Sequence, residues 1–114
     1  MNRSRLRKIE RELIELSRAP RGRKAGVFIG LAQKLGRIRV NRGKEPTYER
    51  KIDPVFKFPL TIPNHPGDIK PGTARSIIDA LLSDVDEWRE WLEQNDETQP
   101  EADVDDDDDA GDQE

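Results

Sequence analysis

The sequence predicts an α+β domain in which a three-stranded antiparallel sheet packs on helices, preceded by one extra N-terminal helix. Apolar residues recur every three or four positions in three segments, which is typical of amphipathic helices. Between the second and third of these segments apolar and polar residues alternate, which is typical of strands. The chain has 114 residues and no internal repeat, so it has room for one domain, with the order α-β-β-β-α after the extra helix.

The composition is strongly charged, and the charge is unevenly distributed along the chain. Charged residues make up 39% of the sequence and hydrophobic residues 32%, which predicts a small core and long solvated segments. Residues 1–58 contain 17 Lys and Arg against 6 Asp and Glu, a net charge of +11, whereas residues 59–114 contain 3 against 18, a net charge of −15. The basic first half can form a surface that binds phosphate backbones.

Several classes of site are excluded by the residues that the sequence lacks. There is no Cys and a single His, so disulfides, thiolate metal sites and a cysteine nucleophile are ruled out, and we expect no metal and no cofactor. The basic start is not followed by an apolar segment, and no apolar run approaches the ~20 residues of a membrane-spanning helix. We therefore expect a soluble, cytoplasmic protein that does not bind membranes.

The first helix is predicted over residues 5–17, where apolar residues follow at spacings of 3, 4 and 3 and Ser4 is available as a cap. Its apolar face consists of Leu6, Ile9, Leu13 and Leu16. Its outer face carries Arg7, Lys8, Arg11 and Arg18. These basic residues either contact phosphate groups or form a solvated face with Glu neighbours three and four positions away. We expect residues 1–22 to be a basic helical arm and linker ahead of a domain over residues 23–95.

A second helix is predicted to end at Gly36, and three strands follow it. The apolar residues that this helix is expected to bury are Val27, Phe28, Leu31 and Leu35. The strands are predicted over residues 37–42, 47–52 and 56–62. In the first strand basic and apolar residues alternate, which predicts that Ile38 and Val40 face the core while Arg37, Arg39 and Asn41 face outward. In the third, Pro59 favours an edge position because it lacks an N–H donor.

The last helix is predicted from Thr73, as its cap, to about Gln94, because apolar residues again recur with a helical period. Trp88 falls on its apolar face, whereas Trp91 is expected not to pack. A turn rich in Pro and Gly precedes the helix and carries His65. The polar, acidic residues 96–114 are expected to be a disordered tail.

The turn and the start of the last helix carry the most specific motif of the chain. Residues 60–78 read Leu-Thr-Ile-Pro-Asn-His-Pro-Gly-Asp-Ile-Lys-Pro-Gly-Thr-Ala-Arg-Ser-Ile-Ile. This stretch, with the predicted element order, resembles the HicA family of toxin–antitoxin systems, in which a strand ending in Ile-Pro-x-His precedes Lys-Pro-Gly-Thr and a helix. The resemblance covers roughly residues 27–82. It implies a fold like that of double-stranded-RNA-binding domains, mRNA interferase activity, and a HicB antitoxin as the protein partner.

One position that the family uses for its activity departs from the family pattern. Glu45 stands in the first hairpin turn, where the family has its catalytic His. The positions that match the family are Gly43, His65, Lys70, Pro71, Gly72, Thr73 and Arg75. The resemblance therefore carries over the fold better than the activity.

Glu45 and His65 are the candidate catalytic residues. Cleavage of RNA through its own 2′-hydroxyl needs a base for that proton, an acid for the leaving oxygen, and cations near the phosphate. Alternatively, Glu45 is a turn carboxylate that pairs with Arg42 or Lys44, and His65 is a structural residue that holds its loop through a hydrogen bond.

The candidate RNA-binding residues form two groups. Lys70 and Arg75, at the start of the last helix, can bind a phosphate, although simple helix capping accounts for them equally well. The second group lies on or beside the first hairpin and consists of Arg37, Arg39, Arg42, Lys44, Arg50 and Lys51. Such a row fits a structured RNA and also fits an acidic protein, including the acidic tail of the same chain.

Three hypotheses for function follow. In the first, the chain is a HicA-like toxin component that binds mRNA, cleaves it or has lost the cleavage, and pairs with a HicB-like antitoxin. In the second, the same fold is a binding module for RNA or protein without catalysis. In the third, it is an interaction protein whose acidic tail binds basic partners.

Overall fold

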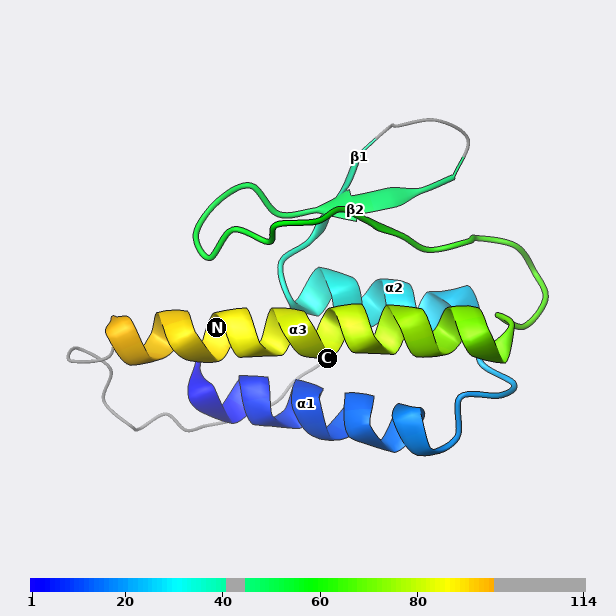
Figure 1. The fold of residues 1–114 in the computed structure, drawn as a ribbon, viewed down its shortest axis with the longest axis horizontal. Helices are drawn as coiled ribbons and strands as arrows, with labels where there is room; N and C mark the ends of the chain where they lie inside the picture. Colours follow the sequence, from blue (N-terminus) through cyan, green and yellow to red (C-terminus); the bar gives the residue numbers. More distant parts are fainter. Residues whose placement is uncertain (41–44, 96–114) are drawn as a thin grey trace.

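The computed structural model describes residues 1–40 and 45–95 of the chain. In this part the elements are α1 (Arg3–Arg18), α2 (Ala25–Lys34), β1 (Ile38–Val40), β2 (Thr47–Glu49), β3 (Leu60–Thr61) and α3 (Pro71–Gln94), as Figure 1 shows. The α+β class and the α-β-β-β-α order after an extra helix are thus confirmed. The predicted acidic tail, and residues 41–44 of the first hairpin, lie outside the described residues.

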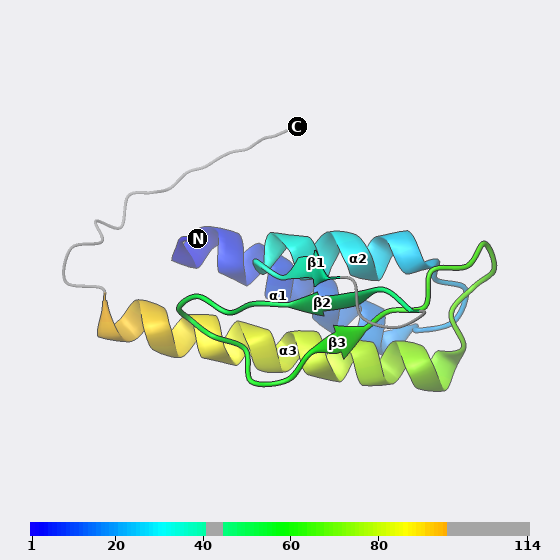
Figure 2. The same cartoon turned by 90° about the horizontal axis from the view of Figure 1, so that it is seen from above.

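The elements form three layers. The three strands make one antiparallel sheet in the order β1-β2-β3. Figures 1 and 2 show this sheet over α2 and α3, with α1 beneath the two helices on the side away from the sheet. α2 and α3 run in the same direction and begin at the same end of the molecule, whereas α1 runs in the opposite direction.

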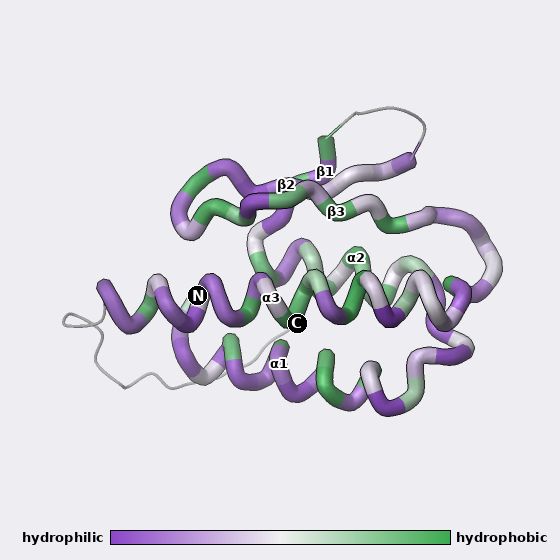
Figure 3. The backbone as a smooth tube through the Cα atoms, in the orientation of Figure 1, coloured by the Kyte–Doolittle hydropathy of each residue, from purple (hydrophilic) through white to green (hydrophobic). Residues whose placement is uncertain are grey.

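α1 is part of the hydrophobic core. Its apolar face is the predicted one, with Leu6, Ile9, Leu13 and Leu16 all buried. Figure 3 shows hydrophobic positions of α1 on the side turned to α3 and hydrophilic ones on the opposite side. The N-cap is Asn2, whose side chain accepts a hydrogen bond of 2.8 Å from the Arg5 N–H, so the predicted cap at Ser4 is wrong by two residues.

α2 ends where the sequence predicts, through a Schellman motif. The Arg37 N–H donates to the Ala32 carbonyl at 3.0 Å and the Gly36 N–H to the Gln33 carbonyl at 2.9 Å, which requires the positive φ of +95° at Gly36. Phe28, Leu31 and Leu35 are buried as expected. Val27 is exposed, contrary to prediction, and the small residues Ala25 and Ala32 occupy the core instead.

The faces of β1 are the reverse of the predicted ones. Ile38 lies opposite Glu49, and Arg39 lies opposite Tyr48. Because cross-strand neighbours share a face and Tyr48 is buried against the helices, Ile38 belongs to the outer face, where 66% of its surface is exposed. Alternation alone does not say which of the two faces is inside, and here Tyr48 of β2 decides it.

The third strand is much shorter than predicted. β3 covers Leu60–Thr61 only, and the residues from 50 to 59 form a loop in which Phe56 is buried and Phe58 is 71% exposed. The loop is closed by a hydrogen bond of 3.1 Å from the Phe56 N–H to the Arg50 carbonyl and contains a cis Asp53–Pro54 peptide. The alternation of residues 56–62 is typical of a strand, but most of these residues belong to the loop instead.

α3 begins two residues earlier than predicted. Pro71 occupies its first turn and Lys70 is the N-cap, so Thr73 is not the cap. Trp88 is buried and its indole N–H donates to the Leu35 carbonyl at 2.7 Å. Trp91, which was expected not to pack, is half-buried with its ring edge-on to Trp88 at 5.7 Å. In the described part of the chain no helix has the length and apolar character needed to cross a bilayer.

Candidate nucleic-acid interface

Two helices begin side by side at one end of the molecule, which we call the helix-start end and define by Lys24, Glu45, His65 and Lys70. Lys24 is the N-cap of α2 and Lys70 the N-cap of α3, and neither forms a side-chain cap hydrogen bond. The first turn of a helix presents unpaired N–H groups and the positive end of the helix dipole. Two such turns running in parallel contribute positive partial charge to this end.

The segment before α3 wraps around the helix-start end and is tied to the start of α2 (Figure 1). The Ile69 N–H donates to the Arg23 carbonyl at 2.7 Å, and Lys24 forms an ion pair of 3.0 Å with Asp68. Lys24 was not among the sequence candidates, although the basic run from Arg21 to Lys24 directly before a helix was a usable signal. These contacts fix the turn that carries His65.

His65 is exposed on this turn. Its ring lies against Gly67, where an added Cβ would meet the His65 Nδ1 atom at 3.8 Å. Within residues 1–40 and 45–95 the ring has no hydrogen-bond partner, so the structural hydrogen bond considered for His65 is not seen there. The turn is instead held through its backbone and through Asp68.

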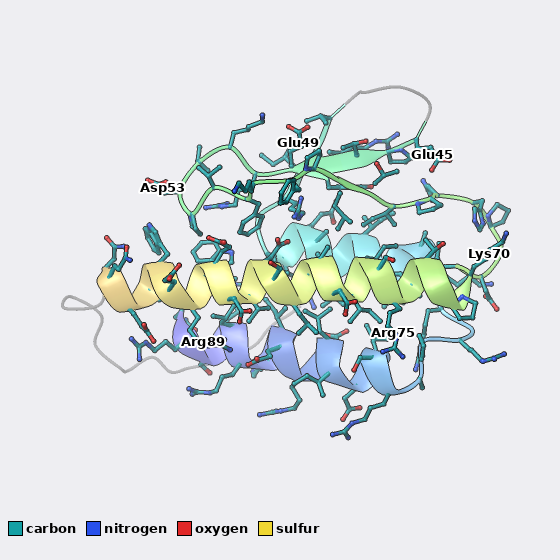
Figure 4. The ribbon with its side chains drawn as sticks, in the orientation of Figure 1. Glu45, Glu49, Asp53, Lys70, Arg75 and Arg89 are labelled. Atoms are coloured by element: carbon teal, nitrogen blue, oxygen red, sulfur yellow. The ribbon has the colours of Figure 1, made fainter. Side chains whose placement is uncertain are left out.

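Glu45 is exposed just before β2, at the same end as Lys70 (Figure 4). The Ile62 N–H donates to the Pro46 carbonyl at 3.1 Å, which joins the chain after Glu45 to the chain that leads to His65. The two residues considered as partners of Glu45, Arg42 and Lys44, lie outside the described residues.

Lys70 and Arg75, expected to act together on a phosphate, point to different places. Lys70 is exposed at the helix-start end. Arg75 is one turn further along α3 and donates to the Ser17 carbonyl at 3.3 Å, at the C-terminal end of α1. A cation at that position stabilises the negative end of the α1 dipole, so Arg75 has a contact within the fold.

Arg37 is buried, and its predicted place on the outer face of the first strand is wrong. Only 5% of the residue is exposed. Its Nε and Nη2 atoms donate to the two Asp84 carboxylate oxygens at 2.6 and 2.9 Å, and Nη1 donates to the carbonyls of Tyr48 and Phe58 at 2.8 and 3.0 Å. Burial raises the pKa of Asp84, and the hydrogen bonds from Arg37 oppose that shift. Asp84, which sequence reasoning missed, was visible as a charged residue inside the apolar stripe of α3.

Arg50 is half-buried and also holds the fold. Its guanidinium donates to the carbonyls of Gly36, Asp53 and Pro54 at 3.3, 2.6 and 2.9 Å and lies 4.8 Å from the Trp88 ring centroid. Burial lowers the pKa of this guanidinium. The continuous basic row is therefore divided. Arg39 is exposed but lies on the same face of the sheet as Tyr48 and not on the predicted outer face, and Lys51 is exposed with its Nζ 3.5 Å from Glu49.

The chemistry available at the helix-start end is phosphate binding and proton transfer. Lys70 and the two helix starts attract an anion, while Glu45 and His65 are solvent-accessible acid–base groups. The described residues contain no group of three or more His, Cys, Asp or Glu side chains that could hold a metal ion.

Comparisons of the chain with protein-family models, with curated proteins and with solved structures give no match.

Proposed function

We propose that this chain is a HicA-like, RNA-binding component of a toxin–antitoxin system, with a HicB-like antitoxin as its protein partner. The observation that carries the proposal is the helix-start end, where two parallel helices begin, Lys70 and Glu45 are exposed at the same end, and the turn before α3 carries the exposed His65. The sequence between β1 and β2 contains two further cations, Arg42 and Lys44.

RNA suits this surface better than a small ligand does. A-form RNA is recognised mainly by shape, through its phosphates and 2′-hydroxyl groups. Helix starts and an exposed lysine provide phosphate contacts, and the neighbouring carboxylate and imidazole provide polar groups for a 2′-hydroxyl. The HicA-like motif of residues 60–78 supports the same assignment by resemblance.

Cleavage would proceed through the RNA's own 2′-hydroxyl. A base at Glu45 or His65 takes the 2′ proton, the 2′ oxygen attacks phosphorus to give a 2′,3′-cyclic phosphate, and the other group protonates the departing 5′ oxygen. A solvated carboxylate is a weak base, so Glu45 in place of the family's His predicts slow cleavage. The same substitution favours a second candidate function, an RNA- or protein-binding module without catalysis.

The test is binding of the purified full chain to a fluorescent RNA hairpin, with Lys70→Glu compared with Lys57→Glu. Lys57 is an exposed lysine in the loop of residues 50–59, and Figure 1 shows this loop on the side of the sheet away from the starts of α2 and α3. Because one phosphate contact of a charged group is worth about 1.5–3 kcal/mol, Lys70→Glu should weaken binding about tenfold or more. It should also reduce the slope of log K against log salt by about 1, and Lys57→Glu should do neither.

The same reactions report on catalysis. Cleaved RNA ending in a cyclic phosphate, with cleavage slowed about 100-fold or more by Glu45→Ala or His65→Ala, makes the chain a ribonuclease. Tight binding with intact RNA makes it a binding module. Equal effects of Lys70→Glu and Lys57→Glu, or no RNA binding at all, would contradict the proposal.

A further inference from the structure

We propose that the outer face of α1 is a docking surface for the acidic C-terminal segment of the same chain, residues 96–114. This inference does not depend on RNA binding, because both the surface and its occupant belong to this chain. It assigns a role to the two strongly charged features that the proposed RNA site leaves unused.

The surface is a stripe of α1 opposite its buried face. Arg7, Arg11, Ile14 and Arg18 follow at spacings of 4, 3 and 4, which places them in one row along the helix. With Glu10 and Glu15 they line a shallow groove of about 350 Å³. Ile14 is 39% exposed, so it adds an apolar residue to a groove that is otherwise lined by charged side chains.

The charge of this groove is not balanced within the described part of the chain. Arg7, Arg11 and Arg18 form no ion pair with any other described residue. Glu10, by contrast, accepts a hydrogen bond of 2.8 Å from Arg89 of α3, so its charge is already compensated. Three arginine forks around an apolar residue suit carboxylates, which guanidinium groups bind in a bidentate manner.

The C-terminal segment has the complementary charge and enough length. Residues 96–114 contain 11 Asp and Glu and no Lys or Arg, with an uninterrupted Asp run from 105 to 109. α3 ends at Gln94, and the contact between Arg89 and Glu10 places its last turns beside the first half of α1. Nineteen extended residues reach roughly 60 Å, whereas the 16 residues of α1 span about 24 Å.

Tethering is what makes such contacts effective. A single exposed ion pair is weak, but a segment joined to the domain by a few residues has an effective concentration in the millimolar range. Several arginine–aspartate contacts then act together, and they should weaken steeply with salt because the groove is open to solvent.

The test uses a spin label on the full chain, which contains no native Cys to interfere. A nitroxide at Asp109→Cys should broaden the amide signals of Arg7, Arg11, Ile14 and Arg18 at least fivefold more than those of β2 at low salt. The broadening should disappear at about 0.5 M salt, where the Debye length is only ~4 Å.

Charge reversal provides the matched comparison. The triple variant Arg7→Glu/Arg11→Glu/Arg18→Glu should abolish the broadening, whereas Lys34→Glu/Lys57→Glu should leave it unchanged, with folding of both checked by thermal unfolding. Broadening that is uniform over the molecule or survives the triple variant would overturn the proposal. Broadening seen only between a labelled copy and a separate isotope-labelled copy would overturn it too, because the contact would then be intermolecular.

Discussion

A buried arginine joins the sheet, the loop before β3 and α3. Arg37 donates two hydrogen bonds to Asp84 and one each to the carbonyls of Tyr48 and Phe58, and its guanidinium lies 5.0 Å from the Phe56 ring centroid. An arginine is buried at tolerable cost only when its charge is paired and its donors are satisfied, as they are here. Alternation in the sequence predicts Arg37 on the outer face of the sheet, because the pattern contains no information about Asp84, its partner 47 residues away.

We predict that Arg37→Ala lowers the free energy of unfolding by about 3–5 kcal/mol, because it leaves the Asp84 carboxylate buried without its partner. Urea unfolding followed by circular dichroism measures the change. Arg39→Ala, at an exposed position two residues along, should change stability by no more than about 0.5 kcal/mol. Equal small effects of the two substitutions would mean that the buried pair does not hold the fold.

Among the elements, the number and order of helices and strands could be predicted from the sequence, but the helix bounds were predicted more closely than the strand bounds and faces. The first helix was expected over residues 5–17 and spans Arg3–Arg18, and the last was expected from Thr73 and begins at Pro71, because a helical period depends on residues close in sequence. The strands depend on distant contacts instead. Arg50 draws the carbonyls of Asp53 and Pro54 into a loop, and only Leu60–Thr61 remains of the third strand.

The end of α2 depends on the backbone conformation of Gly36. Gly36 has a φ of +95°, and a Cβ there would collide with the Arg50 guanidinium, so Gly36→Ala should strain the helix end and displace the arginine. We expect a loss of about 1–3 kcal/mol, measured by chemical denaturation. Gly30→Ala, inside the same helix with open space at its Cβ position, should instead stabilise by about 0.5–1 kcal/mol. The same sign for both changes would contradict this account.

Over the whole molecule, the candidate site could be predicted only in part. The resemblance of residues 60–78 singled out His65 and Lys70, and the fold puts Lys70 and Glu45 at one end. The basic row of the first hairpin is not a single surface, because Arg37 and Arg50 bind within the fold. In the other group of candidates, Arg75 contacts α1. Charge counting identifies basic residues but does not say which of them have partners inside the fold.

The core likewise extends further than the expected boundary at residue 22. Leu13 of α1 is fully buried in the same cluster as Ile78 and Leu81 of α3. If α1 belongs to one cooperative core, Leu13→Ala should lower the free energy of unfolding by about 2–5 kcal/mol. It should shift the transitions seen by circular dichroism and by tryptophan fluorescence together, because both then report one two-state event.

Ile14→Ala, one residue along on the outer face, should shift neither by more than about 0.5 kcal/mol. A helix acting as a separate arm would give a different result: Leu13→Ala would reduce the helical signal while the fluorescence transition of Trp88 and Trp91 on α3 stayed in place.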